Sequence, residues 1–140
     1  MMREAESPGG EKGARPLSPH LQIYAPLINM VMSILHRMTG TALYFGTIIL
    51  AWWLVAAATG KAYFDFVNGL LASQVGLLVL FGYTWALIHH GLGGIRHLVW
   101  DTGRGLGLTT VNALSWLTLF GSIALTLGIW ALAWHVRGGL

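Results

Sequence analysis

Residues 66–95 read FVNGLLASQVGLLVLFGYTWALIHHGLGGI, a stretch without a single Asp, Glu, Lys or Arg. Two further stretches, residues 38–60 and 105–136, also lack these four residue types. A helix that crosses the hydrocarbon core of a bilayer needs about 20 predominantly apolar residues, and each stretch is longer than that. The sequence therefore predicts three transmembrane helices, at about residues 27–58, 68–100 and 110–136.

The composition of the whole chain agrees with a membrane protein. Of 140 residues, 55% are hydrophobic and only 9% are charged, whereas soluble domains carry about 25% charged residues. Residues 1–14 are rich in Glu, Gly and Ser, so we expect a flexible tail there. Residues 15–140 are expected to form one transmembrane domain. The predicted fold class is all-α integral membrane, with no additional soluble domain.

The distribution of basic residues predicts how the chain lies in the membrane. Lys61 and Arg137 lie on one side of the predicted spans, and six basic residues lie at the amino terminus or near the second connection. The positive-inside rule then places the amino terminus in the cytoplasm. Residues 1–14 lack the apolar core of a signal peptide, and their three Glu are unlike a mitochondrial transit peptide. We therefore expect a bacterial inner membrane rather than a mitochondrial one. The six residues are Arg3, Lys12, Arg15, Arg37, Arg96 and Arg104.

The end of the second predicted helix contains ionisable residues that are costly in lipid. His90 and His97 are seven residues apart, so they share a helical face and differ in depth by roughly 10 Å. Such residues usually face a cofactor, a proton path or a partner, and imidazole is a common iron ligand. Because the chain has no Cys, any bound iron is expected to depend on His. We predict that His90 reaches a haem iron while Arg96 and His97 meet the propionates.

Other interpretations of this segment follow from the same residues. The glycines at 91, 93 and 94 allow close approach of either a flat macrocycle or a neighbouring helix. His89 points about 100° away from His90, so only one of the two is expected to face a macrocycle. We favour His90, which shares a face with Gly94 and His97. Packing of the histidines against other helices is the alternative, and Asp101 equally fits an ordinary residue at the membrane boundary.

A second polar group lies near the start of the first predicted helix. Ser33, His36 and Arg37 are spaced by three and four residues, which makes them neighbours on one helical face. The Arg37 guanidinium suits carboxylates, and the Ser33 hydroxyl can donate to a quinone carbonyl. The alternative is that Arg37 extends to the lipid headgroups while Ser33 bonds to its own helix.

Three blocks of the sequence together resemble one known family. RPLSPH at residues 15–20, SILHRMTG at residues 33–40 and HGLGGIRHLVWDTG at residues 90–103 resemble the large cytochrome b membrane-anchor subunit of succinate dehydrogenase, respiratory complex II. With the three predicted spans, the resemblance covers nearly all of the chain from residue 15 onward.

The resemblance implies a role for each matching residue. His90 would be the axial ligand that this chain gives to a single haem b, and a second three-helix anchor subunit would supply the other ligand. The chain would then form half of a heterodimeric haem-binding bundle. His36, Arg37 and His97 fall where contacts to the haem propionates are expected. Ser33 and Arg37 match residues that line the ubiquinone pocket, which the partner anchor and the iron–sulfur subunit complete.

The expected function is therefore that of a membrane anchor that helps reduce ubiquinone with electrons from succinate. No succinate-oxidising site is expected in this chain, because flavin and iron–sulfur chemistry would belong to the flavoprotein and iron–sulfur subunits. Two alternatives remain: a haem-binding anchor of another quinone-linked enzyme, such as a menaquinone-reacting fumarate reductase, and a haem-free membrane scaffold whose histidines only pack helices.

Overall fold

A computed structural model of the chain describes residues 23–138, and these residues form four helices and no strand. Three of the helices are long and apolar enough to cross a membrane. The all-α membrane fold and the three predicted spans are thus confirmed. The helices are α2 (Ile28–Thr59), α3 (Lys61–Leu71), α4 (Gln74–Asp101) and α5 (Leu108–Val136).

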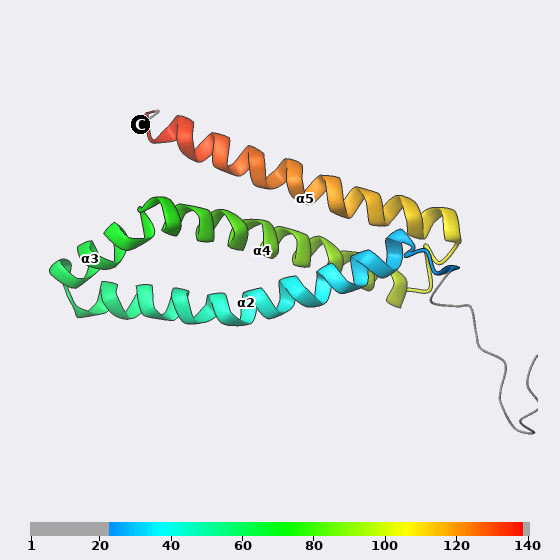
Figure 1. Ribbon diagram of the computed structural model, residues 1–140, viewed down its shortest axis with the longest axis horizontal. Helices are drawn as coiled ribbons and strands as arrows, with labels where there is room; N and C mark the ends of the chain where they lie inside the picture. The colour runs from blue at the N-terminus through cyan, green and yellow to red at the C-terminus, as the bar shows by residue number, and fades with distance from the viewer. Residues whose placement is uncertain (1–22, 139–140) are drawn as a thin grey trace, which may run out of the picture.

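Helix α4 lies between α2 and α5, and it runs antiparallel to both (Figure 1). At one end of the bundle α2 begins, α4 ends and α5 begins; we call this the amino end. At the other, distal end α2 continues through Gly60 into α3. The amino end therefore brings together the start of α2 and the last turns of α4, which carry the predicted site residues.

The second predicted span begins later than expected. It starts at Gln74 rather than at residue 68, and the predicted connection at residues 59–67 is mostly taken up by α3. The helix breaks at Ser73, which adopts an extended conformation and accepts a hydrogen bond from the Gly76 backbone N–H at 3.1 Å. A serine in this position caps a new helix. The apolar pattern continues across the break, which is why hydropathy alone did not reveal it.

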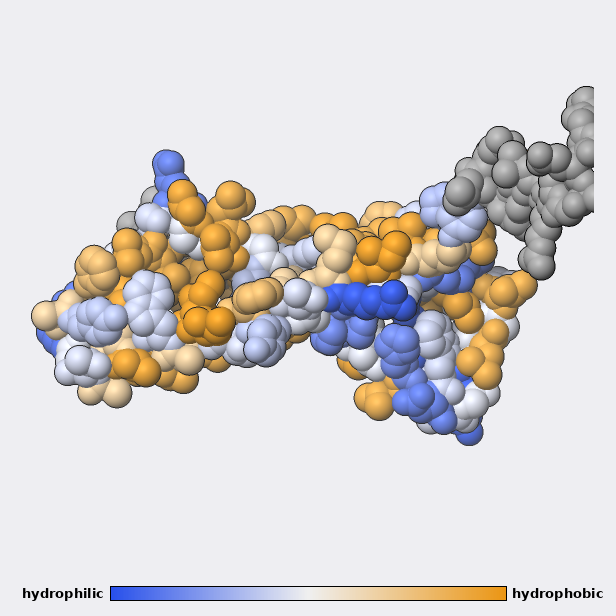
Figure 2. Space-filling view, turned by 60° about the horizontal axis from the view of Figure 1, so that its bottom comes forward, coloured by the Kyte–Doolittle hydropathy of each residue, from blue (hydrophilic) through white to orange (hydrophobic). Residues whose placement is uncertain are grey.

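The surface of the bundle is mostly apolar, and its interior is unusually polar. Figure 2 shows hydrophobic side chains over much of the molecule, with the largest strongly hydrophilic cluster in the half nearer the amino end. Leu78 is 71% exposed, whereas Ser115 and Ser122 are completely buried. In lipid there is no hydrophobic driving force that would bury apolar side chains inside the protein. Small or hydroxyl-bearing residues in the interior let the helices approach closely. The distribution is that of a lipid-embedded protein.

Aromatic rings that fit against glycines form the contact between α2 and α4. Tyr83 of α4 lies against Gly46 of α2 so closely that a Cβ at Gly46 would overlap the ring. Towards the amino end, the His90 ring lies against Gly40, and then His36 of α2 lies against Gly93 of α4. These three contacts follow one another along the antiparallel pair and hold the two helices close.

Hydrogen bonds between side chains connect the opposite face of α4 to α5. The Trp130 indole N–H donates to Thr84 at 3.3 Å, the His89 imidazole bonds to Ser122 at 3.1 Å, and the Arg96 guanidinium donates to the Ser115 hydroxyl at 3.0 Å. Helix α4 therefore contacts α2 through aromatic rings that pack on glycines, and it contacts α5 through hydrogen-bonded polar side chains.

Replacing Gly46 with Ala should destabilise the bundle, because the added methyl group would overlap the Tyr83 ring. Overpacking of this kind costs about 1–3 kcal/mol. The expected result is a lower midpoint of thermal unfolding for the purified protein in detergent. Gly82→Ala is the matched control, since a Cβ at Gly82 meets nothing within 4 Å. Equal midpoints for the two variants would contradict this packing.

Candidate functional site

The side chain of His90 is half-buried between α2 and α4 and is oriented by a hydrogen bond to the backbone. Its Nδ1 lies 3.1 Å from the backbone oxygen of His36 and 3.5 Å from the hydroxyl of Thr39. A carbonyl oxygen only accepts, so Nδ1 carries a proton, and in the neutral imidazole Nε2 then has the free lone pair. Histidines that ligate metals typically donate their other N–H to a carbonyl or carboxylate in this way. The neutral tautomer of His90 is therefore the one that a metal ligand through Nε2 requires.

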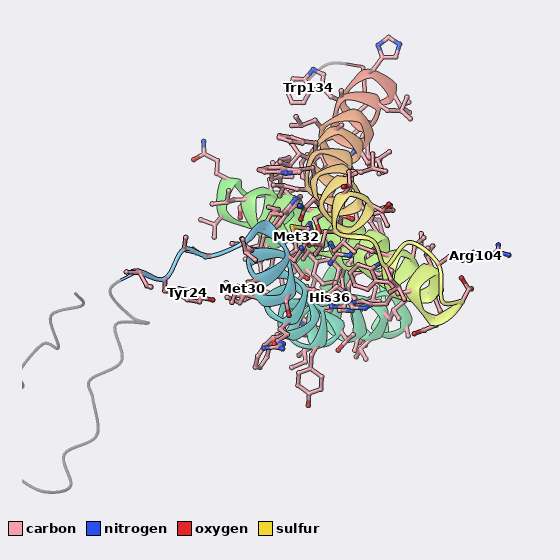
Figure 3. The ribbon with its side chains drawn as sticks, turned by 90° about the vertical axis from the view of Figure 1, so that its right-hand side faces the viewer. Tyr24, Met30, Met32, His36, Arg104 and Trp134 are labelled. Carbon is pink, nitrogen blue, oxygen red and sulfur yellow. The ribbon has the colours of Figure 1, made fainter. Side chains whose placement is uncertain are left out.

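Three of the predicted histidines form one cluster, which we call the histidine cluster. The His36 and His90 rings stack with their centroids 4.0 Å apart and their planes 12° apart. The His97 ring lies edge-on to the His36 ring, with their centroids 5.2 Å apart. Figure 3, seen from the amino end, shows His36 directed from α2 towards α4. Its Nε2 is buried and has no hydrogen-bond partner among residues 23–138, so this cluster contains a polar group suited to a further acceptor or donor.

The three glycines of this segment serve different purposes. Gly93 faces α2, where a Cβ would overlap the His36 ring. At Gly91 and Gly94, in contrast, a Cβ would meet nothing within 4 Å. One glycine therefore serves helix packing, and the other two leave open backbone beside His90. The helix-packing interpretation is thus confirmed for Gly93, and the macrocycle interpretation stays a prediction for Gly91 and Gly94.

Ser33 and Arg37 lie one turn apart on α2, and both are exposed. They lie on the same turns of α2 as His36. The one ion pair among the described residues joins Lys61 and Asp65 at the distal end. Arg37 is thus a charge without a carboxylate partner within residues 23–138. The predicted polar group is assembled on the surface of the bundle, where a second chain or a ligand could cover it.

His89, whose role the sequence left open, packs against α5. It is fully buried, and its Nδ1 lies 3.1 Å from the hydroxyl oxygen of Ser122. Its ring also lies 5.1 Å from that of Trp85. The two neighbouring histidines therefore point to opposite neighbours of α4, His89 to α5 and His90 to α2.

Arg96 does not point where we predicted. It was expected near the haem propionates with His97, but it is only 5% exposed and donates to Ser115 on α5. The physical reason is helix geometry: Arg96 lies seven residues after His89 and shares its face, whereas His97 shares the face of His90. Arg96 also lies 5.1 Å above the ring of Trp100.

A partly buried polar network around Arg96 was not predicted from the sequence. The Ser115 hydroxyl, which accepts from Arg96, lies 2.7 Å from Asn29 Oδ1, and the Asn29 amide donates to Asn112 at 3.0 Å. The network therefore joins α2, α4 and α5 at the amino end. Isolated Asn and Ser residues in apolar helices were its only signal in the sequence.

Other features lie away from this site. Asp101 is exposed at the last position of α4, and Arg104 points away from the bundle in Figure 3. Two cavities of about 450 and 470 Å³ lie at the distal end. None of the predicted site residues lines either cavity. The predicted tail at residues 1–14 and the block at residues 15–20 lie outside the described residues.

These observations define a class of protein: a three-span helical membrane protein that carries, near one end, a cluster of histidines with one imidazole oriented as a metal ligand. Within residues 23–138, no group of three or more His, Asp or Glu side chains is arranged to hold a bare metal ion. The iron of a haem is already bound by four porphyrin nitrogens, so it needs only one imidazole from such a chain.

Comparison with known proteins identifies the family. The profile of the family described as "Succinate dehydrogenase/Fumarate reductase transmembrane subunit" matches residues 11–129. The chain belongs to this family, and the matched range includes all three blocks on which the resemblance was based.

Individual relatives agree with this family. A succinate dehydrogenase cytochrome b556 subunit from Rickettsia felis is 44% identical over 116 residues, which cover 83% of this chain and 90% of the relative. The subunit of the same name from Paracoccus denitrificans is 41% identical, over 81% and 88% of the two chains. The mitochondrial cytochrome b560 subunit from Bos taurus is 36% identical, over 79% of this chain and 69% of the relative.

Replacing Ser115 with Ala should lower the stability of the protein, because Arg96 Nη1 and Asn29 Oδ1 would both lose a buried hydrogen-bond partner. An unpaired buried polar group costs about 1–3 kcal/mol. We expect a lower midpoint of thermal unfolding, and partial recovery when Arg96→Met is added. Thr118→Val is the control, since the buried Thr118 hydroxyl bonds to the backbone of its own helix. A Ser115→Ala midpoint no lower than that of Thr118→Val would contradict the network.

Proposed function

We propose that this chain is the cytochrome b membrane-anchor subunit of a succinate:ubiquinone oxidoreductase. In this function it binds one haem b together with a partner anchor subunit and helps to form the site where ubiquinone is reduced. The membership of the family and the names of its relatives support this function. The single observation that carries the haem assignment is the hydrogen bond from His90 Nδ1 to the backbone oxygen of His36.

The residues of the histidine cluster fit a haem. His90 has its Nε2 lone pair free for iron, and Gly91 and Gly94 leave space along the same segment for a flat ring. In contrast, His89 is fully buried against α5, so a macrocycle would have to separate two packed helices to reach it. These facts favour His90 over His89 as the axial ligand.

The propionates would be held by basic side chains on the same face. His36 has an unpaired, buried Nε2 beside His90, His97 meets the His36 ring, and Arg37 is an exposed cation one residue from His36. Charge-assisted hydrogen bonds to carboxylates are about twice as strong as neutral ones. When bound, the haem supplies a one-electron carrier whose potential depends on its axial ligands and their surroundings.

Ubiquinone would bind at the surface formed by Ser33 and Arg37. The Ser33 hydroxyl can donate to a quinone carbonyl oxygen, and the Arg37 guanidinium can stabilise the negative charge that develops there on reduction. Reduction to the quinol takes up two electrons and two protons. Because both residues lie at the amino end of α2, near the membrane boundary, protons from the aqueous phase are close at hand.

The site needs other chains to be complete. Ser33 and Arg37 are exposed, so a second anchor subunit and an iron–sulfur subunit would close the quinone pocket. A flavoprotein subunit would oxidise succinate and deliver the electrons through the iron–sulfur subunit. In this proposal the amino end faces the cytoplasmic side of a bacterial inner membrane, as the positive-inside rule predicts.

The variant His90→Ala should lose the low-spin haem spectrum of the purified complex, because it removes the imidazole proposed to bind the iron. The measurement is the reduced-minus-oxidised visible spectrum together with the amount of haem per complex. His135→Ala, at the exposed distal end of α5, should retain the full signal. An unchanged low-spin spectrum in His90→Ala would overturn the assignment of the ligand.

Replacing Arg37 with Gln should lower kcat/KM for a short-chain ubiquinone by about 10- to 100-fold, since a hydrogen bond to a charged group is worth about 1.5–3 kcal/mol. Ser33→Ala should cause a smaller loss. Succinate oxidation with a water-soluble dye should stay unchanged in both variants, because that reaction does not use the quinone site. Arg104→Gln, which alters an arginine that points away from the bundle, is the control. A normal quinone rate in Arg37→Gln would contradict this site.

A further inference from the structure

We infer that His89 is a positioning residue: through its hydrogen bond to Ser122, it sets the rotation of α4 that directs His90 towards the haem. This inference rests on the proposed function of His90. Helix α4 carries the two histidines side by side, and each contacts a different neighbouring helix. The contact of His89 with α5 therefore determines which way His90 faces.

The direction of the hydrogen bond between His89 and Ser122 follows from the surrounding groups. The Ser122 hydroxyl lies 2.8 Å from the Leu119 carbonyl oxygen of its own helix and donates its proton there. Its oxygen is then free to accept, and His89 Nδ1–H donates to it at 3.1 Å. Both side chains are fully buried. Because neither side chain is exposed, separation of the pair would leave a buried N–H unpaired.

The geometry of the helix transmits this constraint to the ligand. Adjacent residues on an α-helix point about 100° apart, so His89 faces Ser122 on α5 when His90 faces the His36 carbonyl on α2. A rotation of α4 that turned His90 away from the carbonyl would also pull His89 away from Ser122. The ring of Trp85, one turn earlier on α4 and 5.1 Å from that of His89, further restricts the space in which His89 could move.

The other polar contacts between α4 and α5 constrain His90 less directly. Arg96 bonds to Ser115 two turns nearer the amino end, but its long side chain can follow a small rotation of the helix. Trp130 and Thr84 meet nearer the distal end, at 3.3 Å. His89 is a short, planar side chain adjacent to the ligand itself. We therefore assign the rotational constraint to His89.

The test uses the complete purified complex with haem bound. His89→Phe keeps a ring beside Trp85 but removes the hydrogen bond, and Ser122→Ala removes the acceptor. Ser122→Thr keeps the hydroxyl and should restore the wild-type properties. Thr118→Val is the matched control, because it removes a buried hydroxyl from the same face of α5 that bonds only to its own helix within the described residues.

We expect His89→Phe and Ser122→Ala to keep their haem but to change its electron paramagnetic resonance g-values and its midpoint potential, because both depend on the orientation of the axial imidazole. Ser122→Thr and Thr118→Val should match the wild type. If His89→Phe does not assemble, the comparison of Ser122→Ala with Ser122→Thr decides the question in the same way.

Two results would overturn the inference: wild-type g-values in both His89→Phe and Ser122→Ala, or an equal shift in Ser122→Ala and Thr118→Val. Failure of the proposed function would look different. In that case His90→Ala would itself keep the wild-type haem spectrum, whatever the properties of the His89 and Ser122 variants.

Discussion

Helix α4 carries polar side chains on two faces, towards α2 and towards α5. Because the hydrocarbon core of a bilayer contains no water, each face needs hydrogen-bond partners from the neighbouring helix. On one face, His90 donates to a carbonyl of α2; on the other, His89 and Arg96 bond to serines of α5. Backbone and side-chain polar groups at membrane depth must find partners within the protein. The rotation of α4 that provides partners on both sides places His89 against α5 and His90 against α2.

Polar groups are distributed differently over the α4–α5 interface and over the face formed by α2 and α4. At the interface of α4 with α5, buried polar side chains bond across the two helices, although His89 Nε2 and Arg96 Nε have no partner among the described residues. The face formed by α2 and α4 carries His36 with an unpaired nitrogen and the exposed Ser33 and Arg37. The same three helices thus have a more buried polar side at α5 and a more exposed one at Ser33 and Arg37, and the proposed heterodimeric bundle would use the exposed one.

Much of the fold could be predicted because hydropathy reports directly on lipid exposure. The three spans and the shared face of His90 and His97 followed from length and helical spacing, whereas the place of His36 beside them was implied only by the family resemblance. The break at Ser73 was missed, since the apolar pattern continues through it. Arg96 was placed on the wrong face, although the period of 3.6 residues separates it from His97. The partners Asn29 and Ser115 depend on how α2 and α5 align with each other, which spacing within one helix does not reveal.

The acceptor that orients His90 belongs to the main chain of α2, and this has an evolutionary consequence. The side chain at position 36 can change without removing that oxygen. The path of the α2 backbone, and not this side chain, therefore determines which nitrogen of His90 donates the hydrogen bond. Only a change that bends or shifts this turn of α2 would disturb it. The orientation of the His90 imidazole is therefore buffered against changes of the side chain at position 36.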